Sequence, residues 1–357
     1  MSPGTVALLS GSVLAAFALS LGVTWLGIRY ARRRNLIDHP GQRRSHRVPT
    51  PRGGGIGIVV ATLAIFVAEM VLLPRDALPD LGACVLALVL VAAVGWIDDH
   101  GGLAARWRLL AHFVAAGLIL FALSFQPASI ILDAHGLVQV LVVGMAWVGL
   151  VWSINLHNFM DGIDGILAFQ ALFVFTAFAA LCAYAGADAD AWHLAALAAA
   201  VAAFIPFNFP QARVFMGDVG SGVLGLLIGL SSLRLLSIDE IDATSGLIAC
   251  SGFVIDASCN LLSRMWRGRR WYSAHREHLY QWLVRSGMSH ARVVVWYTGW
   301  NLVAVAPVLW LLNRGLHPAA PFGAAAVLLV YGVGIALWIF GKRWCLDKVK
   351  SHRHASA

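Results

Sequence analysis

The chain consists largely of apolar segments that are long enough to cross a membrane. Runs of about 20 apolar residues recur from one end to the other, and 59% of the 357 residues are hydrophobic while only 12% are charged. In lipid, a helix satisfies its own backbone hydrogen bonds, so runs of this kind form helices. The pattern predicts an all-α polytopic integral membrane protein with no separate soluble domain.

We expect about eleven transmembrane helices in a single membrane-embedded domain, residues 1–357. Residues 343–357 carry several Lys and Arg and are expected to form a disordered basic tail on the cytoplasmic leaflet. The expected spans are 5–28, 53–73, 81–97, 108–124, 137–157, 164–184, 191–207, 218–236, 245–263, 291–313 and 321–342.

Positive charge distinguishes the two faces of this arrangement. Of the 26 Lys and Arg, 23 fall in alternate connections and the C-terminal tail, and only Arg75, Arg234 and Arg314 fall on the other face. Because short loops rich in Lys and Arg stay in the cytoplasm, we expect a periplasmic N-terminus and a cytoplasmic C-terminus. Membrane topology thus accounts for the calculated pI of 9.7, and no nucleic-acid partner is expected.

Three short polar motifs interrupt the apolar spans, and each carries aspartate. They are GWIDDHGGLAARWR with Asp98 and Asp99, NLHNFMDGIDG with Asp161 and Asp164, and FMGDVGSG with Asp218. A charge at membrane depth is costly unless it is paired, hydrated or bound to an ion. All three motifs lie on the predicted cytoplasmic face. We therefore predict one site there that holds a divalent cation and binds phosphate.

The first motif places two adjacent carboxylates at the end of a span. Asp98 and Asp99 disfavour each other's ionisation unless a cation or an arginine compensates. One of them is a candidate general base or metal neighbour, and Arg106 and Arg108 are candidates to neutralise phosphate. A pair of helix-end charges in water is the alternative.

The second motif combines amides and carboxylates at helical spacing. Asn155, Asn158 and Asp161 follow one another at i, i+3, so they face the same way if the fifth span continues. Hard oxygen ligands of this kind suit Mg²⁺ or Mn²⁺ and not zinc. A purely structural turn is the alternative for Asp161 and Asp164.

The third motif opens a span with glycines around Asp218. Free backbone N–H groups at a helix N-terminus favour an anion, whereas Asp218 repels one unless a metal bridges the two. Asp218 is therefore a candidate metal ligand, and a helix-capping aspartate is the alternative.

Two basic loops complete the set. His46 and Arg52 precede three glycines, Gly53 to Gly55, but no strand is expected before the glycines, which argues against a dinucleotide-binding fold. The HREH segment contributes His275, Arg276 and His278 as phosphate donors, and it lacks the third ligand that a zinc site needs. A juxtamembrane stretch that binds lipid headgroups is the alternative, and it is compatible with the functional interpretation.

Taken together, GWIDDHGGLAARWR, NLHNFMDGIDG, FMGDVGSG and HREH resemble the motifs of the polyprenyl-phosphate N-acetylhexosamine-1-phosphate transferases. The resemblance extends from about Arg32 to Arg285. It implies a Mg²⁺-dependent reaction in which undecaprenyl phosphate attacks the β-phosphorus of a UDP-N-acetylamino sugar. UMP leaves, and a lipid-diphospho-sugar forms on the cytoplasmic face of the bacterial inner membrane.

The resemblance also implies roles for individual residues of this chain. It places Asn158 and Asp218 on the metal, and the Asp98–Asp99 pair on the lipid phosphate. It places Asp161 and Asp164 near the nucleotide and the metal, places Arg276 and His278 at the diphosphate and sugar, and gives Asp256 a less defined role. From their own motifs, we also expect nucleotide or sugar binding by Asn155 and His275, and phosphate or lipid binding by His46, Arg52, Arg106 and Arg108.

The chain departs from several subgroups of this family after His278. Tyr280 and Gln281 stand where peptidoglycan-type and common-antigen-type members carry further histidines. This favours the O-antigen-initiating subgroup of lipopolysaccharide biosynthesis, with GlcNAc, QuiNAc or FucNAc as the donor sugar. A homodimer is compatible with the sequence. A transporter of an anionic lipid or sugar phosphate and a non-catalytic lipid-binding scaffold are the alternatives, and neither would release UMP.

Overall fold

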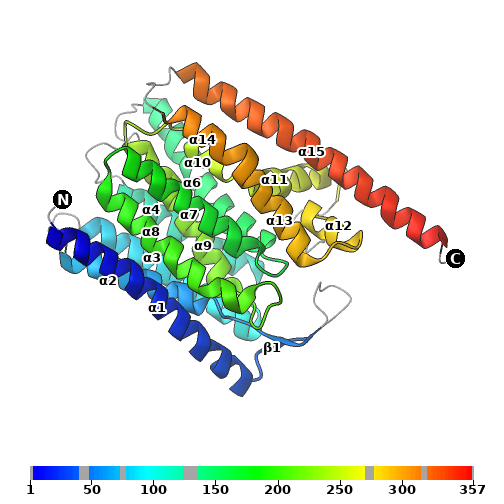
Figure 1. The fold of residues 1–357 in the computed structure, drawn as a ribbon, viewed down its shortest axis with the longest axis horizontal. Helices are drawn as coiled ribbons and strands as arrows, with labels where there is room; N and C mark the ends of the chain where they lie inside the picture. Colours follow the sequence, from blue (N-terminus) through cyan, green and yellow to red (C-terminus); the bar gives the residue numbers. More distant parts are fainter. Residues whose placement is uncertain are drawn as a thin grey trace.

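The protein is a bundle of apolar helices (Figure 1). The computed structural model describes residues 3–39, 48–72, 78–123, 136–269, 277–314 and 320–355. The first helices are α1 (Pro3–Arg33), α2 (Ile56–Leu72), α3 (Leu78–Gly101), α4 (Ala105–Leu123), α6 (Gly136–Met160), α7 (Ile166–Tyr184) and α8 (Asp188–Asn208). The remaining elements are α9 (Asp218–Arg234), η2 (Leu235–Ser237), α10 (Ser245–Ala249), α11 (Ser251–Trp266), α12 (Leu279–Arg285), α13 (His290–Trp300), η3 (Asn301–Val305), α14 (Ala306–Leu312) and α15 (Ala320–Ala355).

Helical segments occupy all eleven of the expected span positions. Within the described residues, eight helical segments are long and apolar enough to cross a membrane, and α2, α4 and the α10–α11 pair fall outside this set. The all-α polytopic class is therefore confirmed. The number of crossings and the orientation of the termini stay predictions. The N-terminal end of α1 and the C-terminal end of α15 lie at opposite ends of the molecule, which is compatible with an odd number of crossings (Figure 1).

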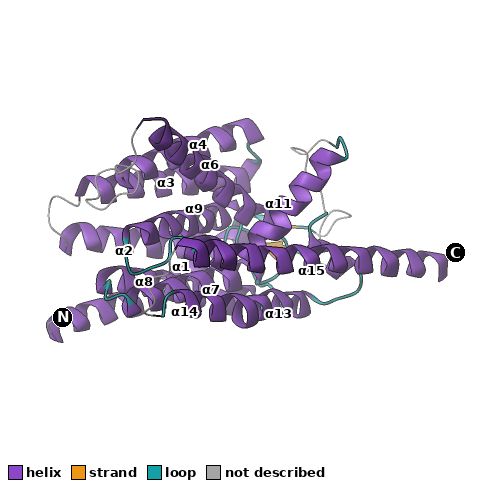
Figure 2. Cartoon of the chain, turned by 90° about the horizontal axis from the view of Figure 1, so that it is seen from above, coloured by secondary structure: helices purple, strands orange, loops and turns teal. Residues whose placement is uncertain are grey.

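Two expected spans are less regular than the sequence suggested. The span at 245–263 is divided at Cys250 into α10 and α11. The span at 291–313 contains a π-helical turn, η3, directly before Pro307. Proline has no N–H to donate to the preceding turn, so a local change of hydrogen-bond pattern is expected there. Figure 2 shows α11 diverging from its neighbours, and Trp266 at its end is 94% exposed.

The C-terminal segment is helical, contrary to the expectation of a disordered tail from residue 343. Helix α15 continues to Ala355. Cys345 is fully buried, and α15 packs against α12, so tertiary contact orders the start of this segment. Lys348 also lies 4.9 Å from the ring centre of Trp344, which stabilises the next helical turn.

Helix α9 lies at the centre of the bundle. It packs against α6, α3, α7, α2 and α4. Most of its side chains are buried, including Val223, Leu224 and Leu227. A helix that is apolar on all sides belongs in the interior of a bundle, and this explains why its periodicity did not reveal a single packing face. The N-terminal residue of this central helix, Asp218, is thereby placed at one end of the bundle interior.

A small antiparallel pair of strands, β1 (Ile37–Asp38) and β2 (Thr50–Pro51), is the exception to the helical fold among the described residues. Strand β2 precedes the three glycines, where no strand was expected. These glycines nevertheless serve close packing. Gly54 N and Gly55 N donate to the carbonyls of Phe215 and Met216 at 2.9 and 2.8 Å. A Cβ on Gly55 would lie 2.5 Å from the Cα of Gly220, so only glycine permits this contact.

Candidate active site

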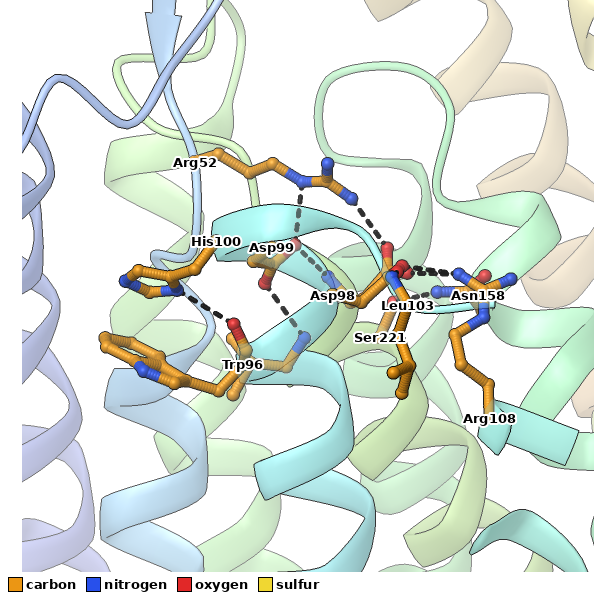
Figure 3. A network of polar contacts seen from close by, with 11 residues as sticks. Arg52, Trp96, Asp98, Asp99, His100, Leu103, Arg108, Asn158 and Ser221 are labelled. Atoms are coloured by element: carbon orange, nitrogen blue, oxygen red, sulfur yellow. Dashed lines mark hydrogen bonds and ion pairs between the residues drawn. The ribbon is translucent and has the colours of Figure 1, made fainter. Parts of the chain in front are cut away.

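Asp218 is the centre of a network of charged side chains that four segments of the chain bring together. Figure 3 shows Arg52, Arg108, Asp98 and Asp99 of this network. Its Oδ1 atom lies 2.9 Å from an Nη atom of Arg52, which follows β2. Its Oδ2 atom lies 2.9 Å from an Nη atom of Arg108, near the start of α4. The same two arginines also bind Asp99 and Asp98 on α3, so three carboxylates share two guanidinium groups.

Asp99 links this network to the N-terminus of α9 through backbone hydrogen bonds. Its two carboxylate oxygens accept hydrogen bonds from the backbone N–H groups of Asp218 and Val219, at 2.9 and 3.1 Å. The first N–H groups of a helix have no partner within the helix, so Asp99 acts as a cap supplied by another helix. Gly217 has a φ of 76°, and a Cβ there would meet the Asp99 carboxylate. The glycine of FMGD is therefore required by local geometry.

Asp98 has a different environment from its neighbour. Its Oδ1 atom accepts from the N–H of Leu103, and its Oδ2 atom pairs with Arg108 at 2.5 Å. The side chain of Asp98 is 11% exposed and that of Asp99 is 3% exposed. Neither aspartate lines the larger cavity beside the network. The geometry thus separates the pair into a more accessible residue and a buried anchor, while the predicted role on the lipid phosphate stays a prediction.

A cavity of about 480 Å³ opens next to Asp218. This volume lies in the usual range for sites that bind small molecules. The cavity brings together sequence-predicted residues from three motifs and several that were not anticipated. Its wall comprises Asp38, Arg52, Asn158, Asp161, Gly162, Ile163, Asp164, Asn208, Phe215, Met216, Gly217, Asp218, Ser221, Gln281, Val284 and Arg285.

Asn158 and Asp161 place hard oxygen atoms on this wall. The amide nitrogen of Asn158 donates to Ser221 Oγ at 2.9 Å, which orients the side chain. Burial, together with the carboxylates of Asp218, Asp99 and Asp164, raises the pKa of Asp161 to about 7. The negative charge here therefore exceeds what the two arginines compensate.

The oxygen-rich wall fits Mg²⁺. In the described part of the chain, no three His, Cys, Asp or Glu side chains form a metal-binding group. Mg²⁺ does not need one, because it is commonly bound through one or two carboxylates together with water and substrate phosphates. Asn158 and Asp218 agree with that chemistry, as does the additional negative charge of Asp161.

Asp164 lies where a second cavity, of about 420 Å³, adjoins the first. Its Oδ2 atom accepts from the N–H of Ala212 at 3.2 Å and lies 3.2 Å from Nδ1 of His290. Asn208 reinforces the same loop, because its Oδ1 atom accepts from the N–H of Gly165 at 2.8 Å.

Other predicted residues lie outside these cavities. Asn155 donates to the carbonyl of Val151 on its own helix at 2.7 Å, so the i, i+3 pattern did not bring it onto the cavity wall with Asn158. Arg106 is exposed and lies 5.6 Å from the ring centre of Trp107. His46, His275 and Arg276 fall outside the described residues.

His278 caps helix α12 and does not line the larger cavity. It is buried, and burial lowers its pKa, which favours the neutral ring. Its ring stacks on that of Tyr280, with 5.8 Å between the ring centres. The Tyr280 hydroxyl donates to the carbonyl of Phe159 at 3.0 Å, directly before the MDGIDG segment. Tyr280 therefore stabilises the start of the loop that carries Asp161 and Asp164.

Asp256 has a definite structural role. It is 1% exposed, and its carboxylate accepts from the N–H of Leu279 at 2.7 Å, from the Tyr297 hydroxyl at 2.7 Å and from Trp338 Nε1 at 2.9 Å. One side chain of α11 thus joins α12, α13 and α15, and fixes the position of α12 beside the cavity.

Sequence reasoning missed Arg285, His290, Ser221 and Asn208. Each is polar and lies at or beside a cavity. Ser221 stands inside FMGDVGSG but was not assigned a role there, and the other three residues were not singled out by any motif. The single glycine at 287, where φ is 100°, stands between Ser286 and Ser289 and was the one local signal for a turn near His290. Contact partners more than 40 residues apart cannot be read from spacing.

The fold and the site thus define a helical membrane bundle with a carboxylate-rich, arginine-bridged cavity at one end. Residues 81–236 match the model of glycosyl transferase family 4. The chain is 29% identical to a decaprenyl-phosphate N-acetylglucosaminephosphotransferase of Mycolicibacterium smegmatis over 93% of its own length and 86% of the relative.

Two further relatives carry related names. An undecaprenyl-phosphate alpha-N-acetylglucosaminyl 1-phosphate transferase of Yersinia pestis is 25% identical over 81% of this chain and 80% of the relative. A phospho-N-acetylmuramoyl-pentapeptide-transferase of Symbiobacterium thermophilum is 30% identical over 63% of this chain and 73% of the relative. The chain belongs to glycosyl transferase family 4, the polyprenyl-phosphate N-acetylhexosamine-1-phosphate transferases. The resemblance drawn from the motifs is confirmed.

Proposed function

We propose that this protein transfers an N-acetylated amino-sugar 1-phosphate from a UDP-sugar to undecaprenyl phosphate. The observation that carries the proposal is the Arg52–Asp218–Arg108 network beside a cavity with excess carboxylate charge. Phosphoryl transfer depends mainly on positioning and on charge stabilisation, and this arrangement supplies groups for both. The names of the relatives support the same reaction type.

In the proposed reaction, an oxygen of the lipid phosphate attacks the β-phosphorus of the UDP-sugar. The bond from that phosphorus to the bridging oxygen breaks, UMP leaves with the bridging oxygen, and a lipid-diphospho-sugar forms. The attacking phosphate is already ionised at neutral pH, so we favour direct attack over a covalent phospho-enzyme. Asp98, the more accessible member of its pair, is placed to orient the lipid phosphate together with Arg108.

We further propose that Asn158 and Asp218 hold Mg²⁺, with Asp161 contributing charge. When bound, Mg²⁺ neutralises the negative charge that develops on the diphosphate. Arg285 lies on the wall of the larger cavity, and no ion pair is seen for it among the described residues, so it is a candidate to bind a donor phosphate. The proposed site faces the cytoplasm of the bacterial inner membrane, where the protein would initiate O-antigen synthesis with GlcNAc, QuiNAc or FucNAc.

The test is UMP release by purified protein in detergent. Undecaprenyl phosphate and Mg²⁺ are supplied with UDP-GlcNAc, UDP-GalNAc, UDP-QuiNAc or UDP-FucNAc in parallel. We expect UMP from at least one donor, with loss of the signal in EDTA and in Asp218→Asn.

The matched control is Asp190→Asn, since Asp190 also pairs with an arginine, Arg234, but at the other end of α9. This variant should retain activity. If folded wild-type protein releases no UMP from any of the four donors, the proposed function is wrong for these substrates, and a transporter assay becomes the next experiment.

A further inference from the structure

His290 reaches the acidic motif from a distant part of the sequence. It is the first residue of α13, 126 positions after Asp164, and its Nδ1 atom lies 3.2 Å from Asp164 Oδ2. Both side chains are largely covered, at 16% and 11% exposure. The contact therefore belongs to the packed interior of the site and not to a freely moving surface pair.

His290 Nδ1 contacts both the backbone and the carboxylate of Asp164. It accepts a hydrogen bond from the backbone N–H of Asp164 at 3.4 Å. It also lies 3.2 Å from Oδ2 of the same residue. Ala212 N donates to the same oxygen at 3.2 Å.

Ala212 N and His290 Nδ1 both lie against one oxygen of Asp164, and the other oxygen stays available. In the described part of the chain, Oδ1 of Asp164 has no hydrogen-bond partner. Asp164 lines both cavities, and Phe215 and Val284 line both with it. A carboxylate fixed in this place presents an acceptor to a ligand that extends along the two cavities.

The position of His290 is itself fixed by the turn between α12 and α13. Gly287 has a φ of 100°, which favours glycine, and Ser289 caps α13 by accepting from the N–H of Arg292 at 3.3 Å. Val284 and Arg285, just before this turn, line the larger cavity. The short segment 284–290 therefore forms part of the cavity wall and also places His290 beside Asp164.

We propose that His290 is a positioning residue for the nucleotide-sugar donor and acts through Asp164. By its contacts with the backbone N–H and Oδ2 of Asp164, it fixes this residue so that Oδ1 faces hydrogen-bond donors of the UDP-sugar, and it makes no contribution to the bond-breaking step. This inference rests on the proposed function, because it assigns the ligand of the two cavities as a UDP-sugar.

The test compares His290→Ala with His290→Asn, because asparagine can place a hydrogen-bonding atom where Nδ1 lies. UMP release is measured with the UDP-sugar and undecaprenyl phosphate varied separately, and UMP binding is measured without lipid phosphate. For His290→Ala, we expect the KM for the UDP-sugar to rise about tenfold and UMP affinity to fall in proportion, as loss of the hydrogen bond that positions Asp164 implies. The kcat and the KM for lipid phosphate should change less than about twofold, and His290→Asn should recover most of the loss.

The matched control is His193, which pairs with Glu69 at 2.6 Å and is similarly covered, at 15% exposure, on the opposite end of the bundle. His193→Ala should leave the KM for the UDP-sugar and UMP affinity unchanged. If His290→Ala does not fold, His290→Gln replaces it, since its longer amide does not superimpose on Nδ1.

Three results would overturn the inference. These are an unchanged KM and UMP affinity in His290→Ala or in its replacement, equal losses in the alanine and asparagine variants, and an equal rise in the KM of both substrates. Wild-type protein that releases no UMP would contradict the proposed function separately. The UMP-binding comparison would still decide the role of His290.

Discussion

The two ends of α9 are both charged, but they are built differently. At its N-terminus, Asp98, Asp99 and Asp218 share Arg52 and Arg108, and a cavity lined by further carboxylates lies alongside. At its C-terminus, roughly 25 Å away for a helix of this length, two acids each have a base of their own, and Asp80 nearby has a buried oxygen without a hydrogen-bond partner among the described residues. Asp190 pairs with Arg234 at 2.8 Å, and Glu69 pairs with His193 at 2.6 Å.

The difference separates a functional arrangement from a structural one. Balanced pairs compensate their own burial and need nothing from outside. Burial and the neighbouring carboxylates raise the pKa of Asp161, and the excess negative charge is unfavourable until a cation or a cationic ligand enters. The uncompensated negative charge at the N-terminal end of α9 is consistent with a binding site. The ion pairs at its C-terminal end are consistent with a role in holding neighbouring helices together.

The comparison is tested most severely by removing one arginine from each end. Arg108→Ala leaves Asp98 without its guanidinium partner and Asp218 with Arg52 alone, so we expect kcat/KM for UMP release to fall about 100-fold or more. Arg234→Ala should lower the Tm but keep kcat/KM within about threefold. Comparable activity losses in both variants would show that the two ends do not differ in function.

A smaller effect is expected on stability from Asp161→Asn. The pKa of Asp161 is about 7 in the folded protein, above the ordinary aspartate value of about 4. Between these values the folded state binds more protons than the unfolded state, so the free energy of unfolding falls as pH rises and reaches its lower level above pH 7.

Asp161→Asn removes this penalty, and its Tm in EDTA at pH 8 should exceed that of the wild type by roughly 3–6 °C. The difference should be smaller at pH 5 and should shrink at pH 8 when Mg²⁺ is added. A lower Tm than wild type at pH 8 would mean that Asp161 is already compensated in the folded protein.

The smallest effect is expected for Glu69→Gln, which removes one charge from a balanced pair. Partly exposed pairs contribute at most about 1 kcal/mol, so the Tm should fall by no more than about 4 °C. UMP release should stay within about twofold of wild type, measured with both substrates saturating. A large activity loss with normal Tm would assign function to this end as well.

Much of the fold was predictable because its signals are local. A long apolar run forms a helix wherever it occurs in lipid, so the segments around Leu88 and Leu226 were placed correctly without knowledge of their neighbours. The break at Cys250 was not predictable, since the apolar composition continues across it. The helical tail after residue 343 also depended on contacts that composition does not describe.

The candidate site likewise contains residues that the sequence could predict and residues that it could not. The motifs around Asp161 and Asp218 were recognisable because glycine and aspartate at a membrane boundary are unusual in themselves, and the structure brings both to one cavity. Asn155 shared the helical spacing of Asn158 but bonds to its own helix instead. His290 has no motif of its own, and its significance comes only from its partner.

The sequence by itself determined that this is a helical membrane protein, that its aspartate motifs face one end and that it belongs to its family. These properties depend on composition and on short motifs. The tertiary structure decided which carboxylate is accessible and which is an anchor, and that Asp256 caps α12 while His290 holds Asp164. Those roles arise from contacts between residues far apart in the chain, and such contacts exist only when the helices are packed.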